Sequence, residues 1–379
     1  MKKILINASN LHNGGGIKVA ASFIAVLQNI IDPLPGCEIV IFVSSAVDKN
    51  LSSFGFQSSS VKKYQVVDVH GLQALKKSIS NKFDGFDAVF TVFGPLYLPK
   101  KIPNHIVGFA QLWILYPDNE VSRSSSLKNR ILLRLKFTAY WFFFRWSAAR
   151  LVVELQHVKD RLVSFKSYPA DRINVVNNCV SSLYFENSKW ATISDLPAQD
   201  EGVIKIGYIS RAYPHKNINF LLQVALEIEE LNSIKVKFFV TLNEAEWMGL
   251  NYEFRSTIIN VGPLSVAQCP TFYQAMNAVI FTSFLECFSA TPIEALTMKR
   301  PLFASDRRFV RDCCAEHAVY FDPENAVQTA KAIHDWYTEI PEDERVRRVE
   351  AAYQHVLTLP NSQDRARGYI EIIKKQLEL

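Results

Sequence analysis

The chain has 379 residues, of which 49% are hydrophobic and 21% are charged, and its net charge at pH 7 is +5. This length suits two domains rather than one small core, and the composition is that of an ordinary soluble globular protein. A modest positive charge does not by itself indicate a nucleic-acid partner, and we expect none.

The start of the chain runs directly into an apolar segment at residues 3–8, without the features of a secretory signal. No apolar run approaches the roughly 20 residues that a membrane-spanning helix needs. The six cysteines show no metal-ligand spacing, and reduced thiols in the cytosol are the default expectation. We therefore expect a cytoplasmic protein.

Apolar, β-branched runs alternate with segments of helical period along most of the chain, which is typical of βαβ units and parallel sheets. In the first half, strands are predicted at residues 4–8, 39–44, 65–69, 88–93, 106–110, 151–155 and 173–177. In the second half, strands are predicted at residues 205–210, 235–241, 258–261, 278–283, 302–305 and 318–321. Helices fit the second half at residues 218–231, 270–275, 292–298, 327–339 and 362–379.

The predicted fold class is therefore α/β, with two doubly wound Rossmann-like domains facing across a cleft. We predict that residues 1–185 form the first domain and residues 203–360 the second. A polar, aperiodic stretch at residues 186–202 is the predicted linker. Residues 361–379 form a final helix that can pack back toward the first domain.

Three glycines, Gly14, Gly15 and Gly16, follow the first predicted strand and precede a helix predicted at residues 19–27. Glycine lets the backbone approach an anion, and a helix start supplies N–H donors. The spacing is not Gly-x-Gly-x-x-Gly, and no acidic residue ends a clear second strand, which disfavours a nicotinamide dinucleotide. A tight turn that binds nothing is an open alternative.

A basic, aromatic stretch follows later in the first domain. Residues 121–153 contain no acidic residue, whereas seven cations and many aromatic residues lie between residues 123 and 150. A basic amphipathic helix rich in Trp and Phe suits an anionic membrane surface. We predict that five of its side chains face such a surface: Arg130, Arg134, Lys136, Trp141 and Arg145. The alternative is an ordinary helix with its aromatics in the core, and three successive phenylalanines require that part of it is buried.

Arg211 and Lys216 follow the first predicted strand of the second domain, and Asn217 is a good N-cap for the helix behind them. The two cations therefore stand together at a strand end and a helix start. Charge-assisted hydrogen bonds contribute ~1.5–3 kcal/mol each, so this pair suits a diphosphate. The alternative is a solvated basic loop. His215, which lies between them, is expected to face solvent.

Glu286 and Glu294 bracket the end of the strand predicted at residues 278–283 and the start of the helix predicted at residues 292–298. Ligands bind at this position in open α/β sheets. A carboxylate can hold sugar hydroxyls there, and the N–H groups of the helix start can hold a phosphate. The alternative is a capping box from Thr291 to Glu294 with Pro292 at the first helical position, in which Glu294 contributes only on the order of 1 kcal/mol to the helix end.

Together these segments resemble the retaining glycosyltransferases of family 4, which have the two-domain GT-B fold. The family's Gly-Arg-x4-Lys pattern is represented by Arg211 and Lys216. Its Glu-Gly-Phe-Gly-x4-Glu-Ala pattern is represented by Glu286 and Glu294, with Cys287 and Ser289 in place of the two glycines. Two further segments match, at residues 175–180 and 301–306. The resemblance is good from about residue 150 to residue 323 and weak before it.

By this resemblance, Arg211 and Lys216 would hold the donor diphosphate and stabilise the departing nucleotide. Glu286 would contact the transferred sugar, and Glu294 would hold the nucleotide ribose. The phosphates would meet the backbone N–H groups of Ser289, Ala290 and Thr291, and the glycine run would line the donor side from the first domain. Cleavage of a glycosyl–phosphate bond builds negative charge on the diphosphate and positive charge on the ring, so this placement is chemically coherent.

Many relatives have a histidine after the strand that is here predicted at residues 106–110, where this chain has Gln111. His12 is one candidate for that role, and a plain loop histidine is an equal alternative. The sequence contains no Asp-x-Asp, the usual metal–diphosphate handle of the other major glycosyltransferase fold. We therefore expect no cofactor and no metal.

The sequence thus predicts a retaining, metal-independent glycosyltransferase, peripheral at the inner face of the plasma membrane. Its donor would be a nucleotide-diphosphate sugar. Its acceptor would be a lipid-linked or lipopolysaccharide-type saccharide in bacterial surface-polysaccharide synthesis, such as that of O-antigen. Two alternatives stay open: a GT-B nucleotide-sugar epimerase, and a catalytically degenerate scaffold of a membrane glycan-assembly complex.

Overall fold

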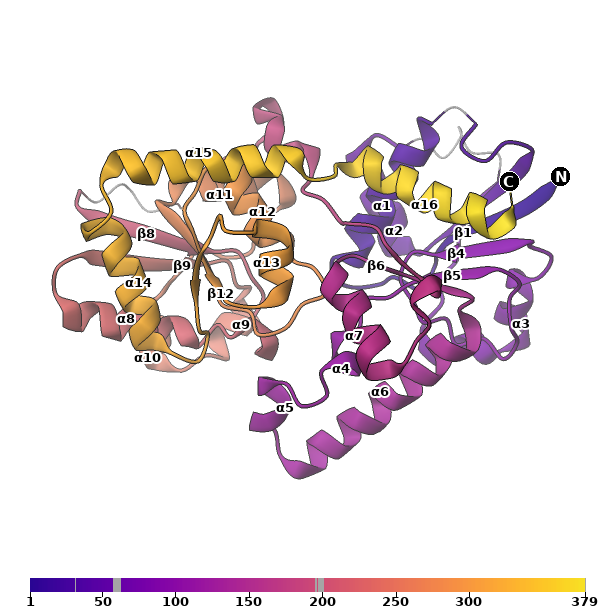
Figure 1. The fold of residues 1–379 in the computed structure, drawn as a ribbon, viewed down its shortest axis with the longest axis horizontal. Helices are drawn as coiled ribbons and strands as arrows, with labels where there is room; N and C mark the ends of the chain where they lie inside the picture. Colours follow the sequence, from indigo (N-terminus) through magenta and orange to yellow (C-terminus); the bar gives the residue numbers. More distant parts are fainter. Residues whose placement is uncertain (31, 57–62, 195, 197–200, 379) are drawn as a thin grey trace. The chain divides into compact units, whose positions relative to one another are not determined.

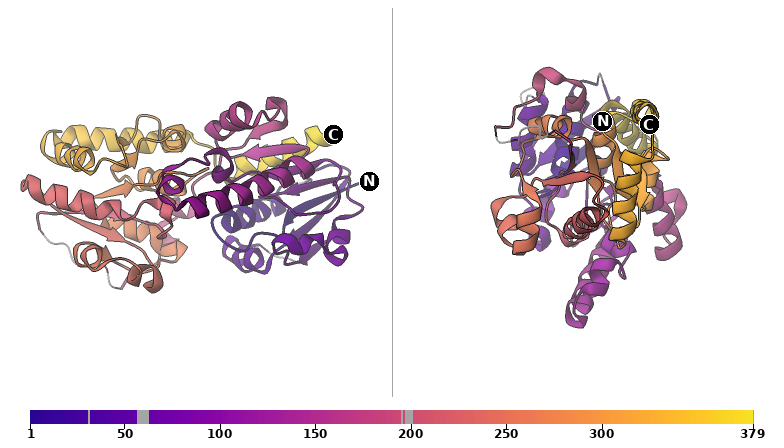
Figure 2. Two further views of the ribbon diagram at one scale, coloured as in Figure 1. Left: turned by 90° about the horizontal axis from the view of Figure 1, so that it is seen from below. Right: turned by 90° about the vertical axis from the view of Figure 1, so that its left-hand side faces the viewer.

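The computed structural model describes residues 1–30, 32–56, 63–194, 196 and 201–378, and the chain divides into two compact units (Figure 1). Unit 1 comprises Met1–Asp118, Ser125–Cys179 and Pro360–Leu379. Unit 2 comprises Asn119–Ser124 and Val180–Leu359. Each unit contains its own parallel sheet, as the alternating sequence pattern predicts (Figure 2).

The sheet of unit 1 has the strand order β3-β2-β1-β4-β5-β6-β7. Its strands are β1 (Lys2–Ala8), β2 (Cys37–Val43), β3 (Tyr64–Val66), β4 (Ala88–Thr91), β5 (His105–Gly108), β6 (Arg150–Val153) and β7 (Ile173–Val175). β1 is central, with Ile4 opposite Ile39 on one side and opposite Ala88 on the other. Both faces of β1 are buried, which is why its sequence is a continuous apolar run.

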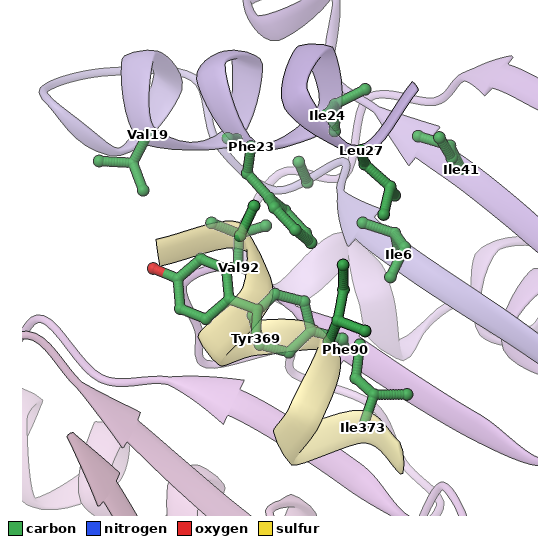
Figure 3. Close-up of a cluster of buried hydrophobic side chains, with 14 of the residues drawn as sticks. Ile6, Val19, Phe23, Ile24, Leu27, Ile41, Phe90, Val92, Tyr369 and Ile373 are labelled. Atoms are coloured by element: carbon green, nitrogen blue, oxygen red, sulfur yellow. The ribbon is translucent and has the colours of Figure 1, made fainter. Parts of the chain in front are cut away.

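The helices of unit 1 are α1 (Gly16–Gln28), α2 (Ser45–Leu51), α3 (Lys77–Ser80), α4 (Leu112–Leu115), α6 (Leu127–Ser147), α7 (Gln156–Lys166) and α16 (Ser362–Leu377). The last helix, α16, completes the core of unit 1, where it packs against α1 and β4 (Figure 3). The Tyr369 ring lies 5.0 Å from the rings of both Phe23 and Phe90, measured between centroids. Residues from the end of the chain are therefore part of the first unit's hydrophobic core.

The sheet of unit 2 has the order β10-β9-β8-β11-β12-β13. Its strands are β8 (Val203–Tyr208), β9 (Lys235–Val240), β10 (Ile259–Asn260), β11 (Ala278–Phe281), β12 (Leu302–Ser305) and β13 (Val319–Phe321). Its helices are α5 (Glu120–Ser124), α8 (Phe220–Leu231), α9 (Glu244–Met248), α10 (Tyr252–Thr257), α11 (Cys269–Ala275), α12 (Ala290–Thr297), α13 (Arg308–Cys314), α14 (Ala326–Thr338) and α15 (Glu342–Thr358).

The division into units differs from the predicted boundaries, because residues 119–124 and 180–185 belong to unit 2 and Pro360 belongs to unit 1. α5 packs against the 3-10 turn at Pro214–Lys216, and Glu120 forms an ion pair with Arg307 at 2.9 Å. Residues 195 and 197–200 of the predicted linker lie outside the described residues. The described part is attached to unit 2, since the Ala191 N–H donates to the carbonyl oxygen of Ala267 at 2.8 Å.

We predict that Ile373→Ala lowers the free energy of unfolding by about 2–5 kcal/mol, because the truncation leaves a cavity between α16 and the sheet. Ile373 is 1% exposed in this core. The measurement is urea unfolding followed by circular dichroism. The control is Lys375→Ala on the exposed side of the same helix, which should change stability by no more than about 0.5 kcal/mol. Equal effects of the two substitutions would contradict the packing of α16.

Candidate functional site

The predicted site residues of unit 2 lie at the point where the chain's winding reverses. β9 and β10 extend the sheet on one side of β8, whereas β12 and β13 extend it beyond β11. Open α/β sheets bind ligands outside the carboxyl ends of the strands at such a reversal. Arg211 and Lys216 follow β8, and Glu286 follows β11, so all three side chains start from this position.

Lys216 and Glu286 form a largely buried ion pair, with side chains that are 16% and 12% exposed. Ser283 Oγ donates a second hydrogen bond to the same carboxylate oxygen at 3.0 Å. Burial would lower the pKa of Lys216, but the Glu286 carboxylate outweighs it and raises that pKa above its ordinary value. Lys216 therefore carries its positive charge at neutral pH inside the site.

The backbone around Lys216 is fixed by side chains from the two central strands. The Lys216 carbonyl oxygen accepts hydrogen bonds from Thr282 Oγ1 at 2.8 Å and from Tyr208 OH at 3.1 Å. Asn217 ends the 3-10 turn in the left-handed conformation, with φ of 52°, and its amide donates to the Pro323 carbonyl at 2.8 Å. The predicted N-cap role of Asn217 is therefore wrong, because α8 begins three residues later, at Phe220, and its N-cap is Asn219.

The Arg211 side chain is more exposed than that of Lys216, and one nitrogen of its guanidinium group forms a hydrogen bond within the protein. Its Nε donates to Glu246 Oε1 at 2.7 Å, and this hydrogen bond raises the pKa of Arg211 further. The same carboxylate oxygen accepts from the Ala212 N–H at 3.2 Å. Only Nε is engaged in this contact, and a guanidinium carries four further N–H donors that suit phosphate oxygens.

Glu246 is a site residue that the sequence reasoning missed. It completes a capping box with Asn243 at the start of α9, and the same carboxylate orients Arg211. Asn-x-x-Glu after a predicted strand is a recognisable capping-box signal. That signal identifies a helix start, but it does not reveal that the glutamate reaches the loop after a different strand.

The capping-box alternative for Glu294 is wrong. α12 begins at Ala290, its N-cap is Ser289 without a side-chain cap, and Pro292 is the third helical residue. Glu294 Oε2 instead accepts a hydrogen bond from Tyr273 OH at 2.9 Å. Tyr273 is fully buried on α11, and burial together with the Glu294 charge raises the pKa of the phenol. Glu294 is thus oriented by a side chain from a neighbouring helix rather than by its own helix end.

The N-terminus of α12 follows the loop that carries Glu286. Ser289 is the N-cap, and Ala290 and Thr291 are the first two helical residues. The first N–H groups of a helix have no acceptor within that helix and attract anions. Arg211, Lys216, Glu286 and the start of α12 therefore follow the carboxyl ends of β8 and β11, and Glu294 lies further along α12. The roles of the individual residues remain predictions.

The glycine run belongs to unit 1. Gly14 has φ of 78°, Gly15 is the N-cap of α1, and Gly16 is the first residue of α1. A Cβ on Gly16 would lie 3.1 Å from the ring of Phe93, so packing alone favours glycine there. The run does lie at the carboxyl end of β1, but its contribution to a donor site carried by the other unit remains a prediction.

The basic aromatic stretch forms α6, and four of the five side chains predicted to face a membrane are at least partly exposed. Arg134, Lys136 and Arg145 are exposed, and Arg130 is partly exposed. Arg134 lies 2.5 Å from Asp118, which Arg130 approaches at 3.9 Å.

The prediction that Trp141 faces a membrane is wrong, because Trp141 is only 9% exposed. Its ring packs edge-on against Phe109 and Tyr168, with centroids 6.4 and 5.8 Å away. Phe144, three residues later, is completely buried on the same face. Because aromatic residues follow one another along this stretch, the sequence alone could not show which of them are buried against the sheet. The large hydrophobic residues that α6 exposes are Leu127, Ile131, Leu132, Leu135, Phe142 and Trp146.

The burial and contacts of two other histidines, His105 and His215, show where each side chain lies. His105 is completely buried in β5, bonds to Thr91 Oγ1 at 2.9 Å, and has its pKa lowered by burial to about 4. It is a neutral core residue. His215 is half-buried rather than facing solvent, and its ring stacks on that of Tyr213. Within the described ranges, no helix has the length and apolarity to cross a membrane.

Comparison with known proteins finds similarity to a family of transferases over part of the chain. Residues 192–355 match the family model described as glycosyl transferases group 1. The O-antigen chain mannosyltransferase RfbU of Salmonella typhimurium is 22% identical over 196 residues, which cover 50% of this chain and 54% of that protein. The chain therefore spans about half the length of this curated relative.

Solved structures share the fold over the whole chain. A glycosyltransferase from Rickettsia africae aligns with a TM-score of 0.70 at 18% identity, covering 100% of this chain and 99% of that one. Sucrose-phosphate synthase from Thermosynechococcus elongatus aligns at 0.66 and 13% identity, covering 100% of both chains. Anabaena HepE in complex with UDP-glucose aligns at 0.63 and 12% identity, covering 100% of this chain and 98% of that one.

At these identities the structural likeness establishes the fold, which is that of the GT-B glycosyltransferases. The family match spans the loops after β8 and β11 that carry the candidate site. Residues 192–355 of this chain are therefore similar to the glycosyl transferases group 1 family.

Proposed function

We propose that the protein is a retaining glycosyltransferase that moves a sugar from a nucleotide-diphosphate sugar to a lipid-linked or lipopolysaccharide-type acceptor. The observation that carries this proposal is the buried Lys216–Glu286 pair beside Arg211 and the start of α12. The similarity to an O-antigen mannosyltransferase supports a role in bacterial surface-polysaccharide synthesis. The fold shared with a protein bound to UDP-glucose supports a nucleotide-sugar donor.

The chemistry follows from the charges at the site. When the glycosyl–phosphate bond breaks, negative charge grows on the departing diphosphate, and Lys216, Arg211 and the N–H groups of α12 would stabilise it. Positive charge grows on the sugar ring, which the Glu286 carboxylate would stabilise. In this scheme the departing charge is balanced by residues of the chain, so the transfer needs no metal ion.

The Lys216–Glu286 pair also prepares the site for its ligand. Removing one partner of a buried pair leaves the other charge uncompensated, at a cost of about 3–5 kcal/mol. Loss of activity in a single Lys216 or Glu286 variant could therefore report misfolding. Arg211 is the better probe of diphosphate binding, because it is exposed and its removal leaves Glu246 bonded to the backbone.

We predict that Arg211→Ala lowers nucleotide-sugar turnover at least tenfold and weakens inhibition by the free nucleoside diphosphate by a similar factor. One charge-assisted hydrogen bond of ~1.5–3 kcal/mol corresponds to that change. The assay uses a panel of nucleotide sugars and a lipid-linked acceptor in the presence of EDTA. The matched control is Arg348→Ala, since Arg348 has similar exposure and donates to Glu344 at 2.8 Å on α15.

Equal diphosphate affinity in the Arg211 variant, the Arg348 variant and the wild type would remove Arg211 from the donor site. Complete loss of wild-type activity in EDTA, restored by added metal, would contradict the metal-independent chemistry. Conversion of a nucleotide sugar without any acceptor would favour an epimerase instead.

We predict that Glu294→Gln raises the donor KM several-fold and leaves the melting temperature nearly unchanged. Glutamine keeps an oxygen that can accept from Tyr273 OH, but it loses the charge that would hold two ribose hydroxyls. Steady-state kinetics and thermal melting distinguish the two effects. A companion variant, Tyr273→Phe, removes the hydroxyl that orients Glu294 and should raise KM in the same direction. If both variants have the wild-type donor KM, Glu294 does not bind the donor and its role is only structural.

We also propose that α6 carries the protein to the inner face of the plasma membrane. Its exposed side chains combine long cations with Leu, Ile, Phe and Trp, which is the composition of helices that lie in the lipid headgroup region. Cations near anionic lipid contribute ~1 kcal/mol each. Such a location would bring a lipid-linked acceptor within reach of unit 1.

We predict that replacing Arg130, Arg134 and Lys136 by Glu releases the protein from anionic vesicles, whereas the wild type binds them and dissociates as salt is raised. The Debye screening length is ~8 Å at physiological ionic strength and shortens as salt is added, so electrostatic binding should weaken. Cosedimentation with vesicles is therefore measured over a salt series. The control replaces three exposed, ion-paired cations of unit 2, Lys331, Arg347 and Arg348, by Glu and changes the net charge equally. If the control variant is also released, or if the wild type does not bind vesicles at low salt, the proposal that α6 binds the membrane is contradicted.

A further inference from the structure

A cluster of two histidines and an aspartate lies at the carboxyl edge of the unit 1 sheet, and the proposed transfer makes no use of it. His12 follows β1, whereas Asp68 and His70 follow β3. Each side chain offers one ligand atom, and these atoms all lie within 4.8 Å of one another. His12 is partly buried and the other two residues are exposed, so solvent and ions can reach the cluster.

The two ring nitrogens of His12 both face hydrogen-bond acceptors. Nε2 lies 3.0 Å from the carbonyl oxygen of Val69, which can only accept, so Nε2 carries a proton. In a neutral ring Nδ1 is then a lone-pair acceptor, and it lies 3.6 Å from Asp68 Oδ1, a second acceptor. The two atoms therefore present metal-ligand lone pairs side by side.

Both residues are held in place by contacts that do not involve an ion. The Ser45 N–H donates to Asp68 Oδ1 at 2.9 Å, and Ser45 Oγ donates to Oδ2 at 2.5 Å. These hydrogen bonds from Ser45 lower the pKa of Asp68, so the carboxylate is charged at neutral pH. A histidine bonded to a backbone carbonyl and a carboxylate bonded to a serine form the outer-shell arrangement that orients metal ligands.

His70 is the third member of the cluster. Its ring stacks on that of His12 with centroids 3.8 Å apart and an angle of 18° between the planes. Two imidazoles and one carboxylate form a three-ligand zinc set, which leaves the fourth position for water or an oxygen of a bound molecule. Bonds of about 2.0–2.1 Å in a tetrahedral site put ligand atoms about 3.4 Å apart, close to the His12–Asp68 separation.

We propose that His12, Asp68 and His70 bind a divalent transition-metal ion of the zinc class, with one coordination position open. Imidazole ligands select such an ion over magnesium, which prefers oxygen ligands. The proposal assigns this ion no part in the transfer, for which Arg211, Lys216 and Glu286 of unit 2 are proposed above.

The test uses the full, tag-free chain after treatment with a chelator and its removal. We expect uptake of one equivalent of Zn²⁺, counted by elemental mass spectrometry, and no competition from a large excess of Mg²⁺. Co²⁺ in place of Zn²⁺ should give the visible d–d absorption of a low-symmetry, four- or five-coordinate site. Affinity is measured by competition with a chromophoric chelator.

Asp68→Asn and His70→Ala should each weaken Zn²⁺ binding at least tenfold. Ser45→Ala keeps all three ligands and removes a hydroxyl that orients Asp68, so it should weaken binding about tenfold or more. The control is His317→Ala, which removes one ring of another stacked pair, His317 and His355, with centroids 4.8 Å apart. Circular dichroism confirms that each variant is folded.

Unchanged Zn²⁺ affinity in the control together with weakened binding in the Asp68, His70 and Ser45 variants would establish the site. No uptake by the wild type would overturn the proposal. Uptake that survives both Asp68→Asn and His70→Ala, or that His317→Ala reduces equally, would also overturn it, because the ion would then be bound elsewhere.

Discussion

Parallel pairing of β8 with β11 is the constraint on which the candidate site depends. The pairing sets Ala278 opposite Ile206 and Val279 opposite Gly207, so the two strands end at the same edge of the sheet. Gly207 also permits close packing, because a Cβ there would lie 2.6 Å from the Met276 side chain. Lys216 and Glu286, which are 70 residues apart in sequence, meet only because these backbones are fixed first.

Stability alone does not account for an ion pair at this edge. Desolvation of two charges offsets most of their attraction, and apolar residues of similar volume are often as stabilising or more so. The contacts around the pair hold it in one geometry, since Ser283 bonds to the carboxylate and Thr282 and Tyr208 bond to the backbone of Lys216. Fixed charges of this kind suit a ligand whose own charge changes during a reaction.

The sequence predicted the strands and most of the site because buried parallel strands are apolar runs and their carboxyl ends carry the polar residues. It could not predict partners that come from other elements, such as Glu246 for Arg211 or Tyr273 for Glu294. The helix α15 was missed because its only fully buried residues are Ala352 and Val356, which leaves almost no apolar period to detect.

The glycine run shows why a sequence signal can stay ambiguous even after the fold is known. Gly14 adopts a left-handed conformation that disfavours other residues, and Gly16 packs against Phe93, so each has a structural reason to be glycine. Gly15 has neither reason, because its φ is −63° and a Cβ there would meet no atom within 4 Å. A requirement for glycine at that position would have to come from a molecule that approaches the backbone. Gly15 is therefore the residue at which the turn and the ligand-binding hypotheses can be separated.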